Sequence, residues 1–176
     1  MTENLVREAS MAGYQTLGED GTRSLLTALR DTSWSWTEPG FPVLAARLGW
    51  AVVEQDAGYG ACVDPGHGLG ARAWRVTFQD GLVTDVTLRI ATAEPVEDTA
   101  GQLFLSDVFA GAVAAGAELL GPPAGRRAGA LPQVRWRWAG TTIIVQLLSE
   151  AVTVFWRANE VQDELDRIAH DFERQG

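Results

Sequence analysis

Apolar and aromatic residues are concentrated between Pro132 and Arg157, where two short turns divide the segment into three runs. The turns fall at Ala139-Gly140 and at Ser149-Glu150, and the runs are rich in β-branched and aromatic residues. Such runs between glycine or polar turns are typical of β-strands. We therefore predict a three-stranded meander over residues 132–157.

The two faces of this meander differ in chemistry. Because side chains alternate across a strand, Val134, Trp136 and Trp138 share one face, and Arg135 and Arg137 share the other. The second strand is apolar on both faces, which is unusual for a sheet with one solvated side. One face should pack on helices, and the other either carries a covering layer, such as the N-terminal segment, or binds another protein.

The same patterns predict four further strands and four helices. The Asp80-Gly81 pair indicates a hairpin turn, and the strand that follows it shows the cleanest alternation in the chain. The remaining strands are predicted at 50–54, 61–64, 71–78 and 82–90. The helices are predicted at 20–31, 42–48, 99–120 and from Asn159 onward.

Two of these helices carry an apolar stripe at helical spacing. In the helix over 99–120 the stripe comprises Leu105, Val108, Phe109, Ala112, Val113, Gly116 and Leu120. Gly111 and Gly116 should let this helix pack closely on a sheet. In the last helix we expect a buried stripe of Val161, Leu165, Ile168 and Phe172 and a capping pair of Asn159 and Gln162.

The resulting order is α-α-β-β-β-β-α-β-β-β-α. It predicts an α+β fold, with an antiparallel sheet and helices packed on it. Residues 1–17 have weak periodicity and are expected to form a flexible N-terminal arm, whereas 18–176 form a single α+β domain. No internal repeat is visible in the sequence.

The net charge of the chain limits the classes of partner that it is expected to bind. A formal net charge of −9 disfavours nucleic acid and anionic membranes and permits a basic protein partner. The chain lacks a secretory signal pattern and any run of eighteen apolar residues, so no transmembrane helix is expected. Cys62 is the only cysteine, which agrees with a reducing compartment. We expect a cytoplasmic protein.

Residue patterns for catalysis are weak. Cys62 and His67, with Asp64 between them, could form a nucleophile pair only if they meet in space. The glycine-rich loop 65–70 lacks the spacing of a phosphate-binding loop. No zinc or calcium spacing occurs, so we predict no metal, no cofactor and no enzymatic activity.

Tryptophan is the unusual residue, with seven in the chain. Most should be core, but tryptophan is also a favoured interface anchor, whereas stacking on single-stranded nucleic acid conflicts with the negative charge. The acids near the start of the last helix form either an ordinary solvated face or a surface for a basic partner. The candidate partner-binding residues are therefore Trp34, Trp36, Trp136, Trp138, Asp163, Glu164 and Asp166.

Three stretches carry a family resemblance: 29–36 followed by 43–50, 86–89, and 131–136 with 141–143. Together they resemble a family of small, uncharacterised proteins from GC-rich Gram-positive bacteria that are often encoded near secreted polymorphic toxins. The resemblance implies an immunity-like or chaperone-like binder. The order of elements is also similar to that of type III secretion chaperones, although fold alone does not define function.

Three hypotheses follow. The first is an immunity protein that occludes the active site of a basic toxin domain. The second is a secretion chaperone that holds a client protein, which an exposed apolar groove, often at a homodimer, would favour. The third is a small enzyme that uses Cys62 and His67.

Overall fold

The structure is a computed structural model that describes residues 13–94 and 98–176. These residues form four helices and nine strands. The helices are α2 (Gly18–Asp31), α3 (Phe41–Leu48), α4 (Thr99–Leu120) and α5 (Asn159–Glu173). The strands are β1 (Tyr14–Thr16), β2 (Ala51–Asp56), β3 (Gly60–Asp64), β4 (Trp74–Gln79), β5 (Leu82–Ala93), β6 (Gly125–Arg127), β7 (Gln133–Arg137), β8 (Thr141–Leu147) and β9 (Ala151–Ala158).

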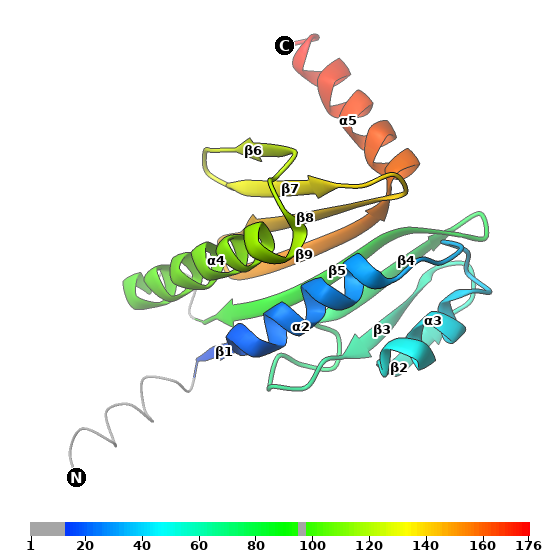
Figure 1. Cartoon of the computed structure of the whole chain (residues 1–176), viewed down its shortest axis with the longest axis horizontal. Helices are drawn as coiled ribbons and strands as arrows, with labels where there is room; N and C mark the ends of the chain where they lie inside the picture. Colours follow the sequence, from blue (N-terminus) through cyan, green and yellow to red (C-terminus); the bar gives the residue numbers. More distant parts are fainter. Residues whose placement is uncertain (1–12, 95–97) are drawn as a thin grey trace.

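All of these strands join one antiparallel sheet, in the order β2-β3-β4-β5-β9-β8-β7-β6, with β1 paired to β5 (Figure 1). Residues Pro132–Arg157 do form the predicted meander, β7-β8-β9. The predicted α+β fold, an antiparallel sheet with helices packed on it, is confirmed. Each half of the sheet is a meander that follows a helix, and the last strands of the two meanders, β5 and β9, meet at the centre.

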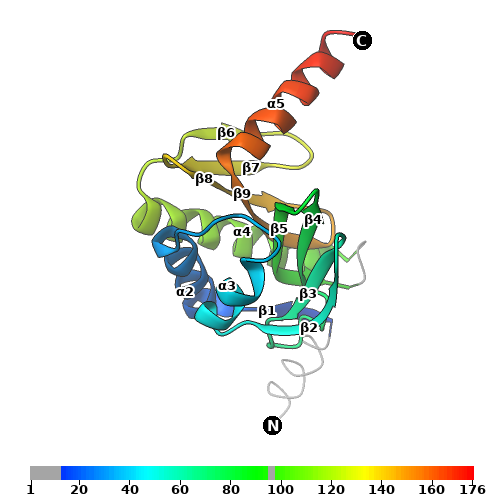
Figure 2. The same cartoon turned by 90° about the vertical axis from the view of Figure 1, so that its right-hand side faces the viewer.

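Helices α2 and α4 lie side by side over one face of the sheet and enclose the core (Figures 1 and 2). Trp136, Trp156 and Leu105 are among the fully buried side chains of this layer. The close packing predicted for Gly116 is confirmed, because a Cβ atom there would lie 2.6 Å from ring atoms of Trp136. The α4 stripe is thus pressed against the sheet.

The other face is covered only in part. Arg135 and Arg137 project from β7 on the side opposite to Trp136, and both bind α5. Helix α5 therefore starts on the face that α4 does not occupy, and its later turns extend away from the sheet (Figure 2). The covering layer on this face is the beginning of α5, and the N-terminal segment does not supply it within the described residues.

Two short strands were not predicted. Tyr14–Thr16, placed in the flexible arm, form β1 and pair with Ala91–Ala93 of β5, so the arm prediction is wrong for these residues. Residues 1–12 of the arm lie outside the described residues. Gly125–Arg127, placed in a loop, form β6 at the edge beside β7. Both strands are held by backbone pairing, which needs no apolar alternation.

Candidate functional site

A groove of about 670 Å³ opens where four separate segments meet. It lies between the connection that follows α2, the start of β5, the β7–β8 turn and the first turn of α5. Three of the predicted partner-binding residues, Trp34, Trp36 and Trp138, line it. We call this cavity the tryptophan groove.

The aromatic rings of the groove form a packed cluster. The ring centroids of Trp34 and Trp36 lie 4.8 Å apart, and Trp36 meets Trp156 edge-on, also at 4.8 Å. Trp156 is completely buried in β9. Trp156 therefore anchors the rings of Trp34 and Trp36 to the core. The contacts have the tilted and edge-to-face geometries that aromatic pairs prefer.

Backbone contacts hold Trp36 in an unusual conformation. Its φ is 56°, a left-handed value that is rare for a bulky residue. Its carbonyl accepts a hydrogen bond from the Val83 amide at 2.8 Å, and Thr37 forms a bridge with Leu82. Strain of this kind persists where the surroundings impose it and is often found at binding sites.

Two rings of the cluster, those of Trp34 and Trp156, have no hydrogen bond at the indole nitrogen among the described residues. Both nitrogen atoms are buried. Buried polar groups are normally satisfied, so these two donors are exceptional. Packing alone positions these rings.

The β7–β8 turn is tied to the start of α5. The Trp138 amide donates to the Thr141 carbonyl at 3.0 Å, and Asn159 Nδ2 donates to the Trp138 carbonyl at 2.5 Å. Thr142 Oγ1 donates to Asn159 Oδ1 at 2.7 Å. The Asn159 side chain therefore stabilises the β7–β8 turn. The predicted capping pair of Asn159 and Gln162 is wrong, because no side chain caps the start of α5. Gln162 instead accepts a hydrogen bond from Arg157 at 2.9 Å.

The predicted acidic residues are engaged within the protein. Arg137 binds Asp163 through two hydrogen bonds, of 2.6 and 2.9 Å, and lowers the pKa of that carboxyl. Arg135 binds Asp166 at 2.6 and 3.0 Å. Burial raises the pKa of Asp166, but the hydrogen bonds from Arg135 and Gln162 outweigh it, so the pKa lies below its ordinary value. These contacts hold α5 on the sheet.

The remaining two predicted residues, Glu164 and Trp136, lie on the surface of α5 and in the core, respectively. Glu164 pairs along α5 with Arg167 at 2.5 Å, which lowers the pKa of the carboxyl. Trp136 is only 1% exposed, and its Nε1 donates to the Gly121 carbonyl at 2.9 Å. The prediction that Trp136 is a surface anchor is wrong, because α4 covers its face of β7.

The predicted buried stripe of α5 is also wrong. Leu165, Ile168 and Phe172 are 42%, 40% and 73% exposed, whereas Val161 is half-buried. Only the first turns of α5 have a sheet to pack on. Val161 also lines the tryptophan groove, so the groove reaches the first residue of the stripe. No local sequence pattern indicates that Leu82, Val83 and Val161 line the groove, because these residues come together only through tertiary packing.

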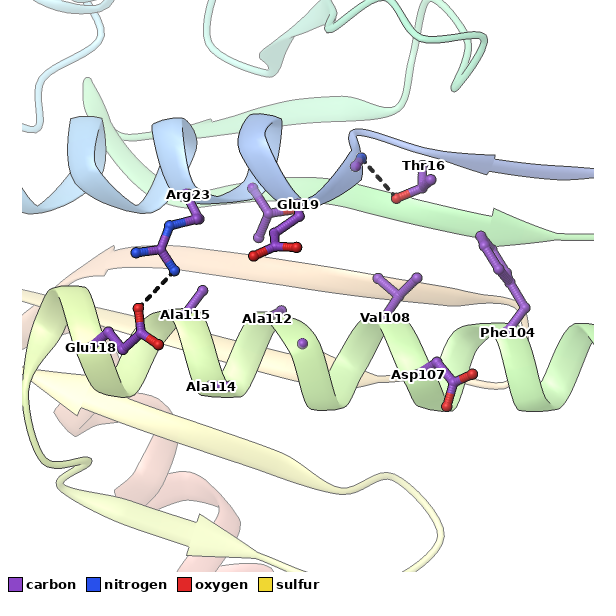
Figure 3. A pocket seen from close by; sticks show the side chains of 13 residues that line it. Thr16, Glu19, Arg23, Phe104, Asp107, Val108, Ala112, Ala114, Ala115 and Glu118 are labelled. Atoms are coloured by element: carbon purple, nitrogen blue, oxygen red, sulfur yellow. Dashed lines mark hydrogen bonds and ion pairs between the residues drawn. The ribbon is translucent and has the colours of Figure 1, made fainter.

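A second cavity, of about 470 Å³, runs along the seam between α2 and α4 (Figure 3). Its floor is made of small and apolar side chains, including Val108, Ala112 and Ala115. At one end, Arg23 of α2 bonds to Glu118 of α4 at 2.9 Å (Figure 3). Gly111, predicted to permit close packing, faces this seam, with nothing within 4 Å of an added Cβ. The polar residues that also line the cavity are Thr16, Glu19, Thr22, Arg23, Asp107 and Glu118, and the Arg23 guanidinium is paired with the Glu118 carboxylate.

The geometry does not join Cys62 to His67. A shallow cavity includes Cys62 among its lining residues but not His67, and no hydrogen bond links the two within the described residues. Asp64 accepts from the Gly66 amide at 2.8 Å and so braces the glycine-rich loop rather than orienting a histidine. Among the residues that the structure describes, no three His, Cys, Asp or Glu side chains gather as metal ligands.

Helix α4 is long and apolar enough to cross a membrane by length and composition alone, a test that the core helix of a soluble protein also passes. In this structure one of its faces packs on α2 and the sheet.

The fold and the groove define an α+β domain with a tryptophan-lined surface cavity. The chain belongs to a family of unknown function, DUF6301, whose model matches residues 20–158. That match includes Trp34, Trp36 and Trp138 and ends where α5 begins. Comparisons with curated proteins and with solved structures gave no match.

Proposed function

We propose that this chain is a non-catalytic protein-binding module that holds an apolar segment of a partner protein in the tryptophan groove, as a secretion chaperone does. The observation that carries this proposal is the convergence of Trp34, Trp36 and Trp138 on one open groove. Ligand sites are typically concave and mainly apolar, with a few polar groups at the edge. Arg30 and Glu160 supply such groups here.

The energetics of interfaces support the same proposal. Tryptophan is enriched among the few residues that dominate binding energy, especially where it forms a well-packed pocket. The rings of Trp34 and Trp36 pack on the buried ring of Trp156. Because they are already ordered, ligand binding should cost little side-chain conformational entropy. A partner side chain with apolar bulk, such as leucine or phenylalanine, would suit this surface.

An immunity protein that occludes a basic toxin is the second candidate, and the net charge of −9 favours it. Electrostatic attraction would speed association and would weaken steeply with salt. The acids of α5 contribute little to such attraction, because arginines of the same chain already pair with Asp163, Glu164 and Asp166. Apolar contact in the groove is therefore the leading mechanism. In either role the protein acts in the cytoplasm.

A groove-blocking variant tests this proposal. Gly140 lines the groove, its φ is not left-handed, and an added Cβ atom would meet nothing within 4 Å. Gly140→Trp should therefore fill the groove without disturbing the core. Gly125→Trp is the matched control, since Gly125 is equally open but lies in β6, away from the groove.

Each tagged protein is used to capture partners from the native lysate, and each captured partner is then purified and titrated. A partner that binds the wild type and Gly125→Trp but loses at least about tenfold in affinity for Gly140→Trp supports the groove. Equal affinity for both variants would overturn it. Binding that survives high salt favours the chaperone role, whereas binding lost at high salt favours the immunity role.

A further inference from the structure

The outer half of α5 presents an apolar stripe that this chain does not cover. Helix α5 reaches away from the sheet, and the C-terminus lies at its far end (Figures 1 and 2). Leu165, Ile168 and Phe172 stay exposed along it. A short helix without packing is marginal in water, and an amphipathic helix is normally stabilised by burial of its apolar face. The stripe therefore points to a covering partner.

The spacing of the stripe fits a second copy of the same helix. Val161, Leu165, Ile168 and Phe172 are separated by four, three and four residues, a series that reads the same in both directions. When two copies of α5 run antiparallel, Val161 of each lies opposite Phe172 of the other, and Leu165 lies opposite Ile168. A two-fold interface requires such self-complementarity.

We propose that α5 pairs in antiparallel orientation with α5 of a second copy, and that Phe172 of the second copy completes the wall of the tryptophan groove. Val161 lines the groove. Phe172 of the second copy, opposite Val161, would therefore stand at the groove's edge. The pairing stands by itself, whereas the role of the completed groove rests on the proposed function.

The charges beside the stripe are compatible with this arrangement. Glu164 and Asp171 flank the stripe on one side, and like charges from two copies would meet there. Arg167 bridges both in the same helix, with N–O distances of 2.5 Å to Glu164 and 3.3 Å to Asp171, so their charge is partly compensated. Charge therefore permits the pairing that the apolar stripe drives.

Sedimentation velocity over a range of protein concentrations tests the pairing without any other partner. The wild type should show a reversible monomer–dimer equilibrium. Phe172→Asp, at a 73% exposed position, should raise the dimer dissociation constant by at least about a hundredfold, because the change removes two apolar contacts per dimer. Leu103→Asp, at a 63% exposed position on α4, is the control and should leave the constant unchanged. A wild type that stays monomeric, or a Phe172→Asp variant that still dimerises, would overturn the pairing.

Cross-linking tests the orientation. Glu160→Cys and Glu173→Cys are made separately in a Cys62→Ser background, and both positions are exposed and leave the stripe intact. In an antiparallel pair, Glu160 of one copy lies level with Glu173 of the other, whereas identical positions lie about 20 Å apart along the axis. A short bismaleimide should therefore join the two variants when they are mixed, and neither variant to itself. Self-linking of each variant would indicate a parallel pair and overturn the register.

Partner titration separates this proposal from the function of the groove. If the second copy completes the groove, the monomeric Phe172→Asp variant should bind the partner at least about tenfold more weakly than the wild type, while Gly140→Trp should dimerise normally. Equal partner affinity for Phe172→Asp would exclude Phe172 from the groove and leave the groove itself intact. If both Phe172→Asp and Gly140→Trp bound the partner as tightly as the wild type, the proposed function itself would be contradicted.

Discussion

Helices α4 and α5 both follow a strand of the central pair, and both carry an apolar stripe at helical spacing, yet their surroundings differ. Leu105 in the α4 stripe is fully buried, whereas Phe172 in the α5 stripe is 73% exposed. Helix α4 lies along the sheet, but α5 meets it only through its first turns. A periodic pattern therefore indicates that a helix has an apolar face, and the topology decides what covers that face.

The two helices also differ in how they are attached. Gly116 lets α4 approach the ring of Trp136 without a side chain between them. Helix α5 is held instead by two arginine–aspartate pairs and by Asn159. Surface ion pairs of this kind contribute little, about 0–1 kcal/mol each. The stability of the domain should thus depend on α4, and its binding on α5 and the groove.

The largest expected effect is on the α4 side of this comparison. Leu105→Ala should lower the free energy of unfolding by about 3 kcal/mol, because it leaves a cavity under a fully buried side chain. Urea denaturation followed by circular dichroism measures the change. Leu103→Ala, on the exposed side of the same helix, should cost less than about 0.5 kcal/mol. Equal losses in the two variants would mean that α4 does not pack as described.

A glycine pair in α4 tests the close approach to the sheet. Gly116→Ala should destabilise the protein by about 1–2 kcal/mol, because the new Cβ would lie 2.6 Å from the Trp136 ring. Gly111→Ala, with open space around it, should instead stabilise the helix by up to about 1 kcal/mol. Thermal unfolding of both variants checks the opposite signs. Two changes of the same sign would contradict the packing.

The matching change in α5 should be small. Leu165→Ala should lower the free energy of unfolding by less than about 1 kcal/mol, measured at protein concentrations where the chain is monomeric. Its exposure of 42% leaves only part of the side chain to lose contacts. A loss close to that of Leu105→Ala would show that the stripe is buried in the single chain after all.

The smallest expected effect is the pH dependence of α5 attachment. The pKa of Asp163 and of Asp166 is lowered in the folded protein by Arg137 and Arg135. Groups with a lowered pKa stabilise the fold above their ordinary pKa, near 4, and this contribution is lost as the pH falls through the lower, folded value. Hydrogen exchange of α5 amides should therefore speed up, relative to those of α4, below about pH 4. An unchanged ratio down to pH 2.5 would contradict a role of these pairs in attachment.

Much of the fold was predictable because its strands bury one face. The 82–90 strand alternates cleanly and becomes the central strand β5. Strands β1 and β6 were missed because each has three residues and depends on backbone pairing with a neighbour. The α5 stripe was correctly seen as apolar and wrongly placed in the core, since sequence periodicity does not record where a helix leaves the sheet.

The site was predictable only in part. Composition singled out Trp34, Trp36 and Trp138, which the structure brings together. Alternation also placed Trp136 with Trp138 on one face, but Trp138 lies just beyond the end of β7, where the chain turns toward the groove. Val161 entered the groove through the pairing of β9 with β5, which no local pattern reveals.

Oxidative footprinting of the tryptophan rings in the wild-type chain, with and without a purified partner, would show whether the partner lies in the tryptophan groove. Bound partner should lower the oxidation of Trp34, Trp36 and Trp138 severalfold. Trp50, which packs against Trp74 away from the groove, should be unchanged. Unchanged oxidation of the three groove residues in a saturated complex, or protection confined to Trp50, would contradict the claim that the partner lies in the tryptophan groove.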